Sequence, residues 1–365
     1  MSIFAIAGSV IFFLLNLYCY KSLAKNAVFK KFSAVILFGF VFIYSAQLGF
    51  FLGWAKSSII AYKIAIYSIG FSFMSFCILA PSDLLGALLA NRQKKQRQIL
   101  RIFYDIGVII ALISYLIFGY LNATNTQIKE RSVELKGLQS PLKAVFISDV
   151  HLGDYLDGNY SAKIANLINA QNADMTFIVG DFIDTKAHKL NGHLEPFKAL
   201  NSKVFFVTGN HEYYHGAKEI IEKIKEQNIV VLENSSQHYK GLNIAGISDI
   251  QARKFNEQTD IKTALKDVNS SLPTILLTHQ PKSIKDFDED DLSKINLILS
   301  GHTHAGQIFP FSLLVWLAQG YIYGEYDISK NSKLIISSGV GFWGPPMRIL
   351  SNSEIVVLNL KPQGQ

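Results

Sequence analysis

The sequence predicts an amino-terminal all-α bundle of four membrane-spanning helices, followed by a layered α/β domain. Residues up to about 121 are dominated by Phe, Ile, Leu, Ala and Tyr in long uncharged runs, whereas the remainder alternates short apolar runs with charged stretches. At 365 residues the chain is long enough for two domains. We therefore expect a transmembrane domain at 1–121, a linker with a possible edge strand at 122–141 and an α/β domain at 142–365.

Four segments in the first part approach the roughly 20 apolar residues that a helix needs to cross a bilayer. They are Ile3–Tyr20, Ser33–Trp54, Ser58–Ala80 and Ile102–Leu121. Pro81, Ser82 and Asp83 predict the end of the third segment. A buried helical bundle in a soluble protein is the alternative, but four such segments in series are rare in soluble cores.

The net charge of +7 is confined to the first part of the chain. Residues 1–121 carry 11 Lys and Arg against Asp83 and Asp105, and residues 122–365 carry 24 against 26 acidic residues. Because the basic excess belongs to the membrane part, it does not indicate a nucleic-acid groove.

The basic residues also predict an orientation. The second connection carries only Lys56, with Lys63 near a helix end, whereas the first and third connections are rich in lysine and arginine. The positive-inside rule therefore places the first and third connections in the cytoplasm. Four spans then leave both termini and the α/β domain on the outer face, an extracytoplasmic location. Cys19 and Cys77 fall inside expected spans, so the α/β domain has no cysteine ligand or disulfide.

The second part reads as strands that alternate with helices. Strand-like runs lie at 131–135, 142–148, 175–179, 203–208, 229–232, 243–246, 274–277, 295–299, 333–338 and 354–360. Helical spacing is found at 161–170, with Ser161 available as a cap, and at 217–227. The alternation favours a layered α/β domain, and the shorter later strands favour a mixed, two-sheet sandwich.

Five short polar motifs each follow one of these apolar runs. They contain Asp149, His151, Asp181, Asp184, Asn210, His211, His279, His302 and His304. The carboxyl ends of strands in an open α/β sheet are where ligand crevices form. A mixed Asp, Asn and His set without Cys suits a pair of divalent transition metals. The glycines directly before Asp181, Asn210 and His302 permit close backbone approach. The alternative, that each histidine only satisfies a loop, would have to hold at every motif independently.

The order D-x-H, GD-x-x-D, GNH-E, H and G-H-T-H resembles the calcineurin-like metallophosphoesterase superfamily from Lys143 to Leu360. The resemblance implies a four-layer αββα sandwich with a dinuclear centre of Mn, Fe or Zn. It implies one metal on Asp149, His151 and His304, and a second on Asn210, His279 and His302, with Asp181 bridging them. It further implies that His211 is a catalytic residue rather than a ligand, and that Asp184 orients it.

The residues after the last motif narrow the expected function. Gly301–Gln307 is followed by the apolar segment Ile308–Tyr323 and later by Gly341–Arg348. This pattern is similar to membrane-associated members that hydrolyse lipid-linked substrates, including UDP-diacylglucosamine hydrolases. Ala305 stands where many relatives have Gly. The segment Ile308–Tyr323 either enters the bilayer surface or packs on the sheet.

We therefore expect a membrane-anchored hydrolase of phosphodiester or pyrophosphate bonds, acting on a lipid-linked or envelope substrate. A phosphomonoesterase for soluble compounds is one alternative, and a non-catalytic membrane sensor with a metal-binding module is another. The oligomeric state is not predicted. His188, His193, His215 and His238 read as surface or packing histidines, and the acidic residues 286–291 as a solvated loop. Tyr213 and Tyr214 either line the substrate pocket or pack.

Overall fold

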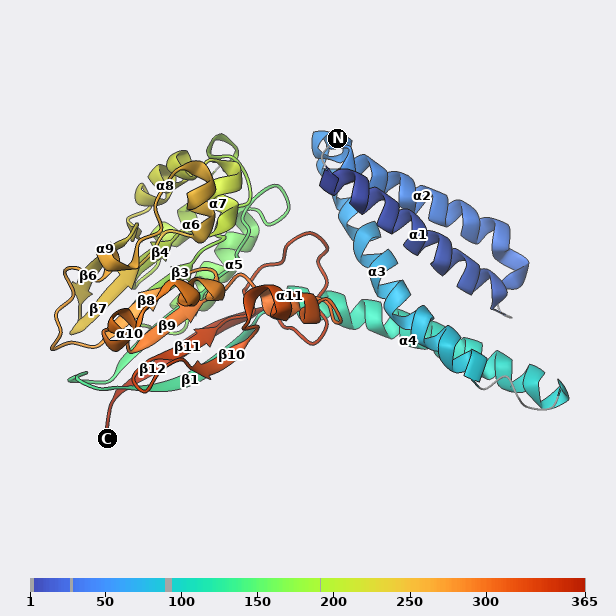
Figure 1. Ribbon diagram of the computed structural model, residues 1–365. Coiled ribbons are helices and arrows are strands. Elements are labelled where there is room, and N and C mark those ends of the chain that lie inside the picture. Colours follow the sequence, from blue (N-terminus) through green and yellow to red (C-terminus); the bar gives the residue numbers. More distant parts are fainter. Residues whose placement is uncertain (1–2, 27–28, 89–93, 191, 365) are drawn as a thin grey trace. The chain divides into compact units, whose positions relative to one another are not determined.

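The computed structural model describes residues 3–26, 29–88, 94–190 and 192–364, which form two compact units. The first unit comprises the chain up to Thr124 together with Trp343–Arg348, and the second comprises Asn125–Phe342 with the residues from Ile349 onward (Figure 1). Within the first unit, the backbone N–H of Arg348 donates to the carbonyl of Gly119 at 2.8 Å. The domain boundaries expected at residues 121 and 142 remain predictions.

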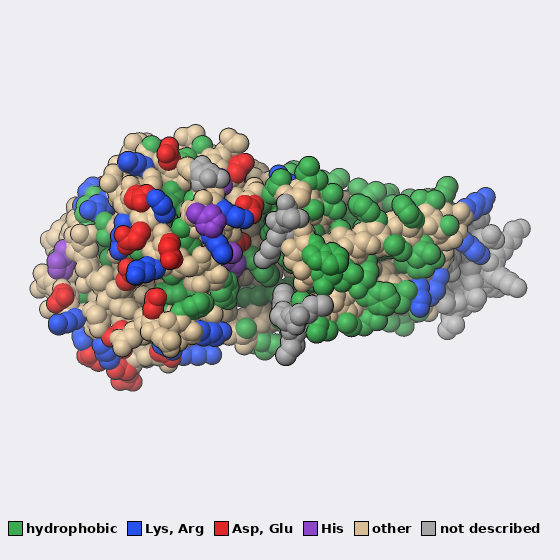
Figure 2. Space-filling model, turned by 90° about the horizontal axis from the view of Figure 1, so that it is seen from above, with side chains coloured by type: hydrophobic (Ala, Val, Ile, Leu, Met, Phe, Trp, Pro, Cys, Tyr) green, Lys and Arg blue, Asp and Glu red, His purple; other side chains and the backbone are tan. Residues whose placement is uncertain are grey.

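The first unit is built from long apolar helices. They are α1 (Ile3–Lys25), α2 (Ser33–Phe51), α3 (Ile59–Leu88) and α4 (Lys94–Thr124), with short 3-10 turns at Lys30–Phe32 and Trp54–Ser57. Each of the four is long and apolar enough to cross a membrane, by length and composition. Large apolar side chains such as Phe38 and Val35 face outward, at 75% and 69% exposure. Figure 2 shows hydrophobic side chains over the helical unit and charged ones over the other. The prediction of four apolar amino-terminal helices is confirmed.

The sequence predicts that the third helix ends at Pro81, but in the structure it does not. Pro81 lies inside α3, which continues to Leu88. A proline inside a transmembrane helix is tolerated where nearby hydroxyls satisfy the backbone carbonyls around it. Here the Ser82 hydroxyl donates to the carbonyl of Ile78 at 2.6 Å, and the Tyr104 hydroxyl of α4 donates to the carbonyl of Ser82.

A buried polar cluster joins α1, α2 and α3. Asn16 donates to the side chain of Gln47 at 2.7 Å, Gln47 donates to Ser72 at 2.8 Å, and Ser72 donates back to Asn16 at 2.7 Å. Gln47 also donates to the carbonyl of Ser68 at 2.9 Å. Because each side chain serves as donor and acceptor for the others, the cluster holds the three helices in one register.

The second unit contains two six-stranded mixed sheets. The first has the order β1-β12-β2-β3-β4-β5, with β1 (Gln127–Leu135), β12 (Glu354–Pro362), β2 (Leu142–Ile147), β3 (Met175–Val179), β4 (Lys203–Val207) and β5 (Val230–Val231). The second has the order β10-β11-β9-β8-β7-β6, with β10 (Gly324–Asp327), β11 (Lys333–Ile336), β9 (Leu297–Ser300), β8 (Thr274–Leu277), β7 (Leu242–Gly246) and β6 (Ser235–Tyr239). From β2 to β5 and from β11 to β7 neighbouring strands are parallel.

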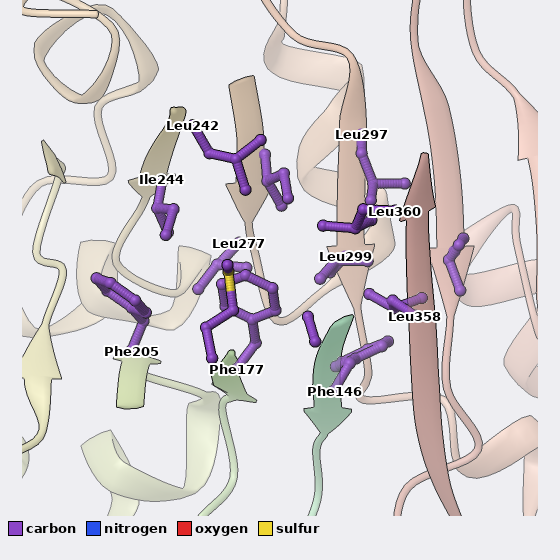
Figure 3. Close-up of a cluster of buried hydrophobic side chains, with 14 of the residues drawn as sticks. Phe146, Phe177, Phe205, Leu242, Ile244, Leu277, Leu297, Leu299, Leu358 and Leu360 are labelled. Atoms are coloured by element: carbon purple, nitrogen blue, oxygen red, sulfur yellow. The ribbon is translucent and has the colours of Figure 1, made fainter. Parts of the chain in front are cut away.

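Alternation along the strands produces the layers. In β2, Phe146 points to a core shared by both sheets, whereas Val145 and Ile147 point to the opposite face. The shared core includes Phe177 and Leu299 and is shown in Figure 3. Strands buried on both faces need a helical layer on each outer side. The resulting four-layer sandwich confirms the predicted fold class.

Helices cover both outer faces. The first sheet packs against α5 (Gly158–Asn169), α6 (Glu195–Lys198) and α8 (Ala217–Lys225), and the second against α9 (Ile261–Ala264), η5 (Pro281–Asp286) and α10 (Glu289–Ser293). The remaining elements are η3 (Ala187–Lys189), α7 (Asn210–His215), η4 (Ile250–Phe255), η6 (His304–Gly306) and α11 (Ser312–Gln319).

Two local expectations are corrected. Helix α5 is capped by Asp157, whose carboxylate accepts from the N–H groups of Asn159 and Tyr160, and not by Ser161, which lies inside the helix. The acidic residues 286–291 are not a simple loop, because Asp288 caps α10 and pairs with Lys262. In both places a carboxylate satisfies N–H groups that a helix start leaves without partners.

Candidate metal centre

The predicted ligands gather at one edge of the two sheets. Asp149 follows β2, Asp181 follows β3 and Asn210 begins α7 just after β4, so the first sheet contributes three motifs. The second sheet contributes His279 after β8, and His302 and His304 after β9. Since these strands are neighbours in their sheets, residues far apart in sequence meet at their carboxyl ends.

One group consists of Asp149, His151 and His304, whose candidate ligand atoms all lie within 4.8 Å of one another. Nε2 of His304 is 3.4 Å from Oδ1 of Asp149 and 3.1 Å from Nε2 of His151. Two imidazole nitrogens at this distance, with a buried carboxylate beside them, form a suitable pocket for a divalent cation.

A second group consists of Asp181, His279 and His302, again within 4.8 Å. Nε2 of His279 is 3.1 Å from Oδ2 of Asp181. The other ring nitrogen of His279, Nδ1, lies 2.9 Å from the carbonyl of Val179 and donates to it, so Nε2 is the atom that faces Asp181. Asn210 is buried, and its side-chain oxygen has no hydrogen bond from the described residues.

Asp181 lies between the two groups. Its Oδ2 is 4.0 Å from Nε2 of His151 in the first group, compared with 3.1 Å to His279 in the second. The close approach depends on Gly209, because a Cβ there would lie 2.2 Å from Oδ1 of Asp181. A backbone without a side chain is thus required directly before Asn210.

The backbone at the site is strained. Asp149, His151, Asp181, His302 and His304 all have positive φ between 49° and 69°. Five of the seven predicted ligands therefore adopt a conformation that is uncommon outside glycine. Strain of this kind persists where surrounding structure enforces it, and it clusters at functional sites.

His211 and Asp184 form the predicted pair. Nδ1 of His211 is 2.7 Å from Oδ1 of Asp184, and Nε2 of His211 is 3.9 Å from Oδ2 of Asp181. Burial lowers the pKa of His211, but the carboxylates of Asp181 and Asp184 outweigh it and raise that pKa to about 9. His211 therefore carries a proton at neutral pH in the metal-free protein.

His215 was expected to be a surface or packing histidine, but it contacts the site. Its Nε2 is 2.9 Å from the same Asp184 oxygen that faces His211. The position one helical turn after His211 on α7 brings both rings to Asp184. The i, i+4 spacing of His211 and His215 was the available signal in the sequence.

Glu212 and Asp249 also belong to the site, although sequence reasoning gave them no role. The buried carboxylate of Glu212 accepts from the backbone N–H groups of Gly209, Asp181 and Ile183 at 2.6, 3.1 and 2.8 Å. It therefore ties the second motif to the third. Asp249 follows β7 and accepts from the side chain of Gln280 at 2.9 Å, next to His279.

The electrostatics of the metal-free site differ between the predicted ligands. Burial raises the pKa of Asp149, and the carboxylates of Asp181 and Asp149 outweigh burial and raise the pKa of His279 well above its usual range. Burial opposes ionisation of Asp181, but His279 and His211 hold its pKa well below its usual range. Burial and the nearby His279 lower the pKa of His302 to about 3, so its ring is neutral. An ionised carboxylate and a neutral imidazole are the forms that bind metals.

The two adjacent tyrosines have different environments. Tyr213 is buried and packs on Phe255 with ring centroids 5.8 Å apart. Tyr214 is 55% exposed, and its ring centroid lies 5.3 Å from that of His211. Tyr214 is thus the one beside the site.

Comparison with known proteins supports the same assignment. The family model for calcineurin-like phosphoesterases matches residues 142–306. The chain is 37% identical to an uncharacterised metallophosphoesterase of Campylobacter jejuni over 98% of both chains. It is 36% identical to one of Helicobacter pylori over 99% of both. It is 32% identical to a Danio rerio transmembrane protein with a metallophosphoesterase domain, over 76% of this chain and 68% of the relative.

The chain belongs to the calcineurin-like metallophosphoesterase family and is a metal-dependent phosphoric ester hydrolase. The predicted pair of divalent ions is confirmed by the family and by the two ligand groups, whereas their identity stays a prediction. The four apolar helices, with relatives named as transmembrane proteins, make it a membrane protein.

Proposed function

We propose that this chain is a membrane-anchored phosphoesterase that cleaves phosphodiester or pyrophosphate bonds in a lipid-linked or envelope substrate. The observation that carries the proposal is the convergence of four motifs into two ligand groups with Asp181 between them. The third motif joins them through the backbone N–H of His211, which donates to Oδ1 of Asp181 at 2.9 Å. In this assignment Asp149, His151 and His304 hold one metal, and Asn210, His279 and His302 hold the other.

The side chains present fit such a pair of ions. Two carboxylates, four imidazoles and one amide oxygen form a mixed oxygen and nitrogen donor set suited to Mn, Fe or Zn. When bound, two neighbouring cations orient phosphate oxygens and lower the pKa of a water between them. Glu212 holds the turns that carry Asp181 and Asn210, so the ligands are already in place before substrate arrives.

His211 supplies the proton in this proposal. Its Nδ1 faces Asp184, so its Nε2 is the atom that points to Asp181 and the reacting phosphate. A protonated Nε2 donates a hydrogen bond to a phosphoryl oxygen and a proton to the leaving alkoxide. Asp184 keeps the ring in this orientation, and His215 contacts the same oxygen of Asp184.

The second compact unit, which carries the candidate metal centre, is called the catalytic unit below. Its attachment to the membrane helices supports a lipid-linked substrate. Only residues 125 and 126 separate the end of α4 from the start of β1. A catalytic unit tethered to membrane helices by so short a connection meets lipid headgroups at high effective concentration.

Turnover by the full-length protein in detergent tests the proposal. With Mn²⁺ we expect bis(p-nitrophenyl) phosphate to be cleaved faster than p-nitrophenyl phosphate, and chelation to abolish both reactions. A lipid-extract screen should then yield a cleaved phospholipid or lipid-linked pyrophosphate.

Each alternative gives a different result. A faster monoester reaction would indicate a phosphomonoesterase. Full metal loading without any turnover would indicate a binding module. A substrate found only in the soluble metabolite fraction would contradict the lipid-linked part of the proposal.

A further inference from the structure

A continuous apolar surface follows the GHTH motif. Nine large apolar side chains are exposed among the described residues of the catalytic unit, and six of them lie between 309 and 317. These six are Phe309, Phe311, Leu313, Leu314, Trp316 and Leu317. Backbone pairing of Ile308 with Ile349 adds the exposed Leu350. We call this set, Phe309–Leu317 with Leu350, the apolar ridge.

The helix at the centre of the ridge has the reverse of a water-facing pattern. The helix is α11, labelled in Figure 1. Its Leu317 is 70% exposed whereas its Gln319 is 4% exposed. A surface helix in water normally buries its leucines and exposes its glutamine. The sequence from Ala305 to Gly324 also contains no charged residue. An apolar patch of this kind marks an interaction surface.

The ridge is built onto the loop that carries His304. A Cβ on Gly306 would lie 2.2 Å from Cα of Ser312, so the start of α11 packs directly on η6. The Thr303 hydroxyl donates to the carbonyl of Ile322 at 2.6 Å, on the far side of α11. The Ser351 hydroxyl donates to the carbonyl of His304 at 2.6 Å. The ridge and the metal loop therefore form one rigid piece.

We infer that the apolar ridge inserts into the lipid bilayer at its interface and brings the metal centre to lipid headgroups. The occupant follows from the chain itself, because two residues connect the catalytic unit to a candidate span. Over that length the connection reaches about 10 Å. An uncharged helix with Trp and Leu on its solvent-exposed face is suited to the boundary between lipid headgroups and acyl chains. The inference rests on the membrane anchoring in the proposed function. It adds that the enzyme meets its substrate at the bilayer interface.

Tryptophan fluorescence of the full chain in lipid nanodiscs tests the inference without using turnover. The chain has three tryptophans, so the double variant Trp54→Phe/Trp343→Phe leaves Trp316 as the reporter. We expect lipids brominated near the headgroup end of the acyl chain to reduce its fluorescence, relative to unbrominated lipids. Acrylamide, which quenches from water, should have little effect.

A matched control places the reporter elsewhere on the same unit. His238 is exposed on the edge strand β6, so His238→Trp in a background without the native tryptophans reports from the opposite end of the second sheet. This reporter should respond to acrylamide and not to bromine. Adding Leu314→Ser and Leu317→Ser to the Trp316 protein should weaken its bromine quenching.

The other occupants give distinct results, and each overturns the inference. Quenching of Trp316 by acrylamide alone would show that the ridge lies in water. Protection from both quenchers would show that protein covers it, either the chain's own helices or a second copy. Failure of the proposed hydrolysis would leave the quenching result unchanged, so the two proposals fail separately.

Discussion

At the residue scale, Asp184 is the carboxylate that both His211 and His215 contact. One of its oxygens lies 2.7 Å from His211 and 2.9 Å from His215. Its other oxygen is 3.7 Å from Nδ1 of His151, a predicted ligand. The carboxylate therefore connects His211, the proposed proton donor, to the candidate metal centre. It fixes the position of the His211 ring and, together with Asp181, raises the pKa of His211.

The proposed roles of Asp181 as a metal ligand and of His211 as a proton donor predict different effects on metal content and turnover when each is replaced. Asp181→Ala removes the carboxylate between the two groups, so we expect metal content and turnover to fall together. His211→Ala should leave metal content near normal and slow turnover by about 10²- to 10⁴-fold, the range for a lost general acid. Metal analysis and phosphodiester turnover of the two purified variants measure this. Equal metal loss in both would contradict the division.

Asp249 predicts a pH dependence of stability in the metal-free protein. Burial raises its pKa from 3.8 to about 6, so the fold favours the protonated form. That preference contributes fully below about pH 4 and is lost as the pH rises through about 6, an effect of at most about 3 kcal/mol. Asp249→Asn stays neutral, so the excess of its thermal midpoint over that of the wild type should appear above about pH 4, grow with pH and be complete above about pH 6.

Chelated protein in detergent, measured at several pH values, provides the comparison. The difference between variant and wild type isolates Asp249 from the other titrating groups. A difference that does not change with pH would show that folding leaves the pKa of Asp249 unchanged.

At the element scale, the bundle is held by polar contacts as well as by packing. Apolar side chains gain little by leaving lipid, so hydrogen bonds between helices contribute to their association. The cluster of Asn16, Gln47 and Ser72 supplies three such bonds between α1, α2 and α3.

Gln47→Leu should therefore weaken the bundle. The change removes hydrogen bonds to Asn16, Ser72 and the carbonyl of Ser68, and we expect a loss of about 0.5–2 kcal/mol. Ser45→Ala is the control on the same helix, because Ser45 donates to the carbonyl of Val41 one turn earlier and, within the part of the chain that the structure describes, to no other helix. Thermal unfolding in detergent compares them, and equal midpoints would show that the cluster contributes nothing.

Strands and motifs could be read from the sequence because their signals are local. The run Met175–Val179 was predicted with the bounds that β3 has, because four apolar residues and the β-branched Thr176 stand between polar residues on either side. The prediction that the third helix ends at Pro81 was wrong because it applied the rule for helices in water. Here the hydroxyls of Ser82 in α3 and Tyr104 in α4 donate to backbone carbonyls of α3. Helix α11 was read only as an apolar segment, because its sequence lacks the polar face of a soluble helix.

The parts of the site that depend on contacts between distant segments of the chain could not be predicted from the sequence. The ligand types and their motifs are visible in the sequence, and the structure brings them together. The bonds of Glu212 to Asp181 and of Asp249 to Gln280 join motifs about 30 residues apart, which no local pattern encodes. Positive φ at five of the ligands is likewise imposed by neighbours and not by residue type.

At the scale of the whole molecule, the charge distribution predicts which side of the membrane the catalytic unit occupies. Basic residues are concentrated in the connection between α1 and α2 and in the connection between α3 and α4. We propose on this basis that both termini and the metal centre lie outside the cytoplasm.

Reporter fusions at the carboxyl terminus test this location. Alkaline phosphatase, which folds only after export, should be active, and green fluorescent protein exported in unfolded form should be dark. A fluorescent fusion with an inactive phosphatase would place the catalytic unit in the cytoplasm and reverse the orientation.

The central claim, that seven side chains from five motifs hold two metal ions, is tested most directly by metal stoichiometry. Elemental analysis of the full-length protein, purified with Mn²⁺ and freed of excess ion, should give two equivalents per chain, and Asp181→Ala should lose both. One equivalent or none in the folded wild type, or two equivalents retained without Asp181, would contradict the account.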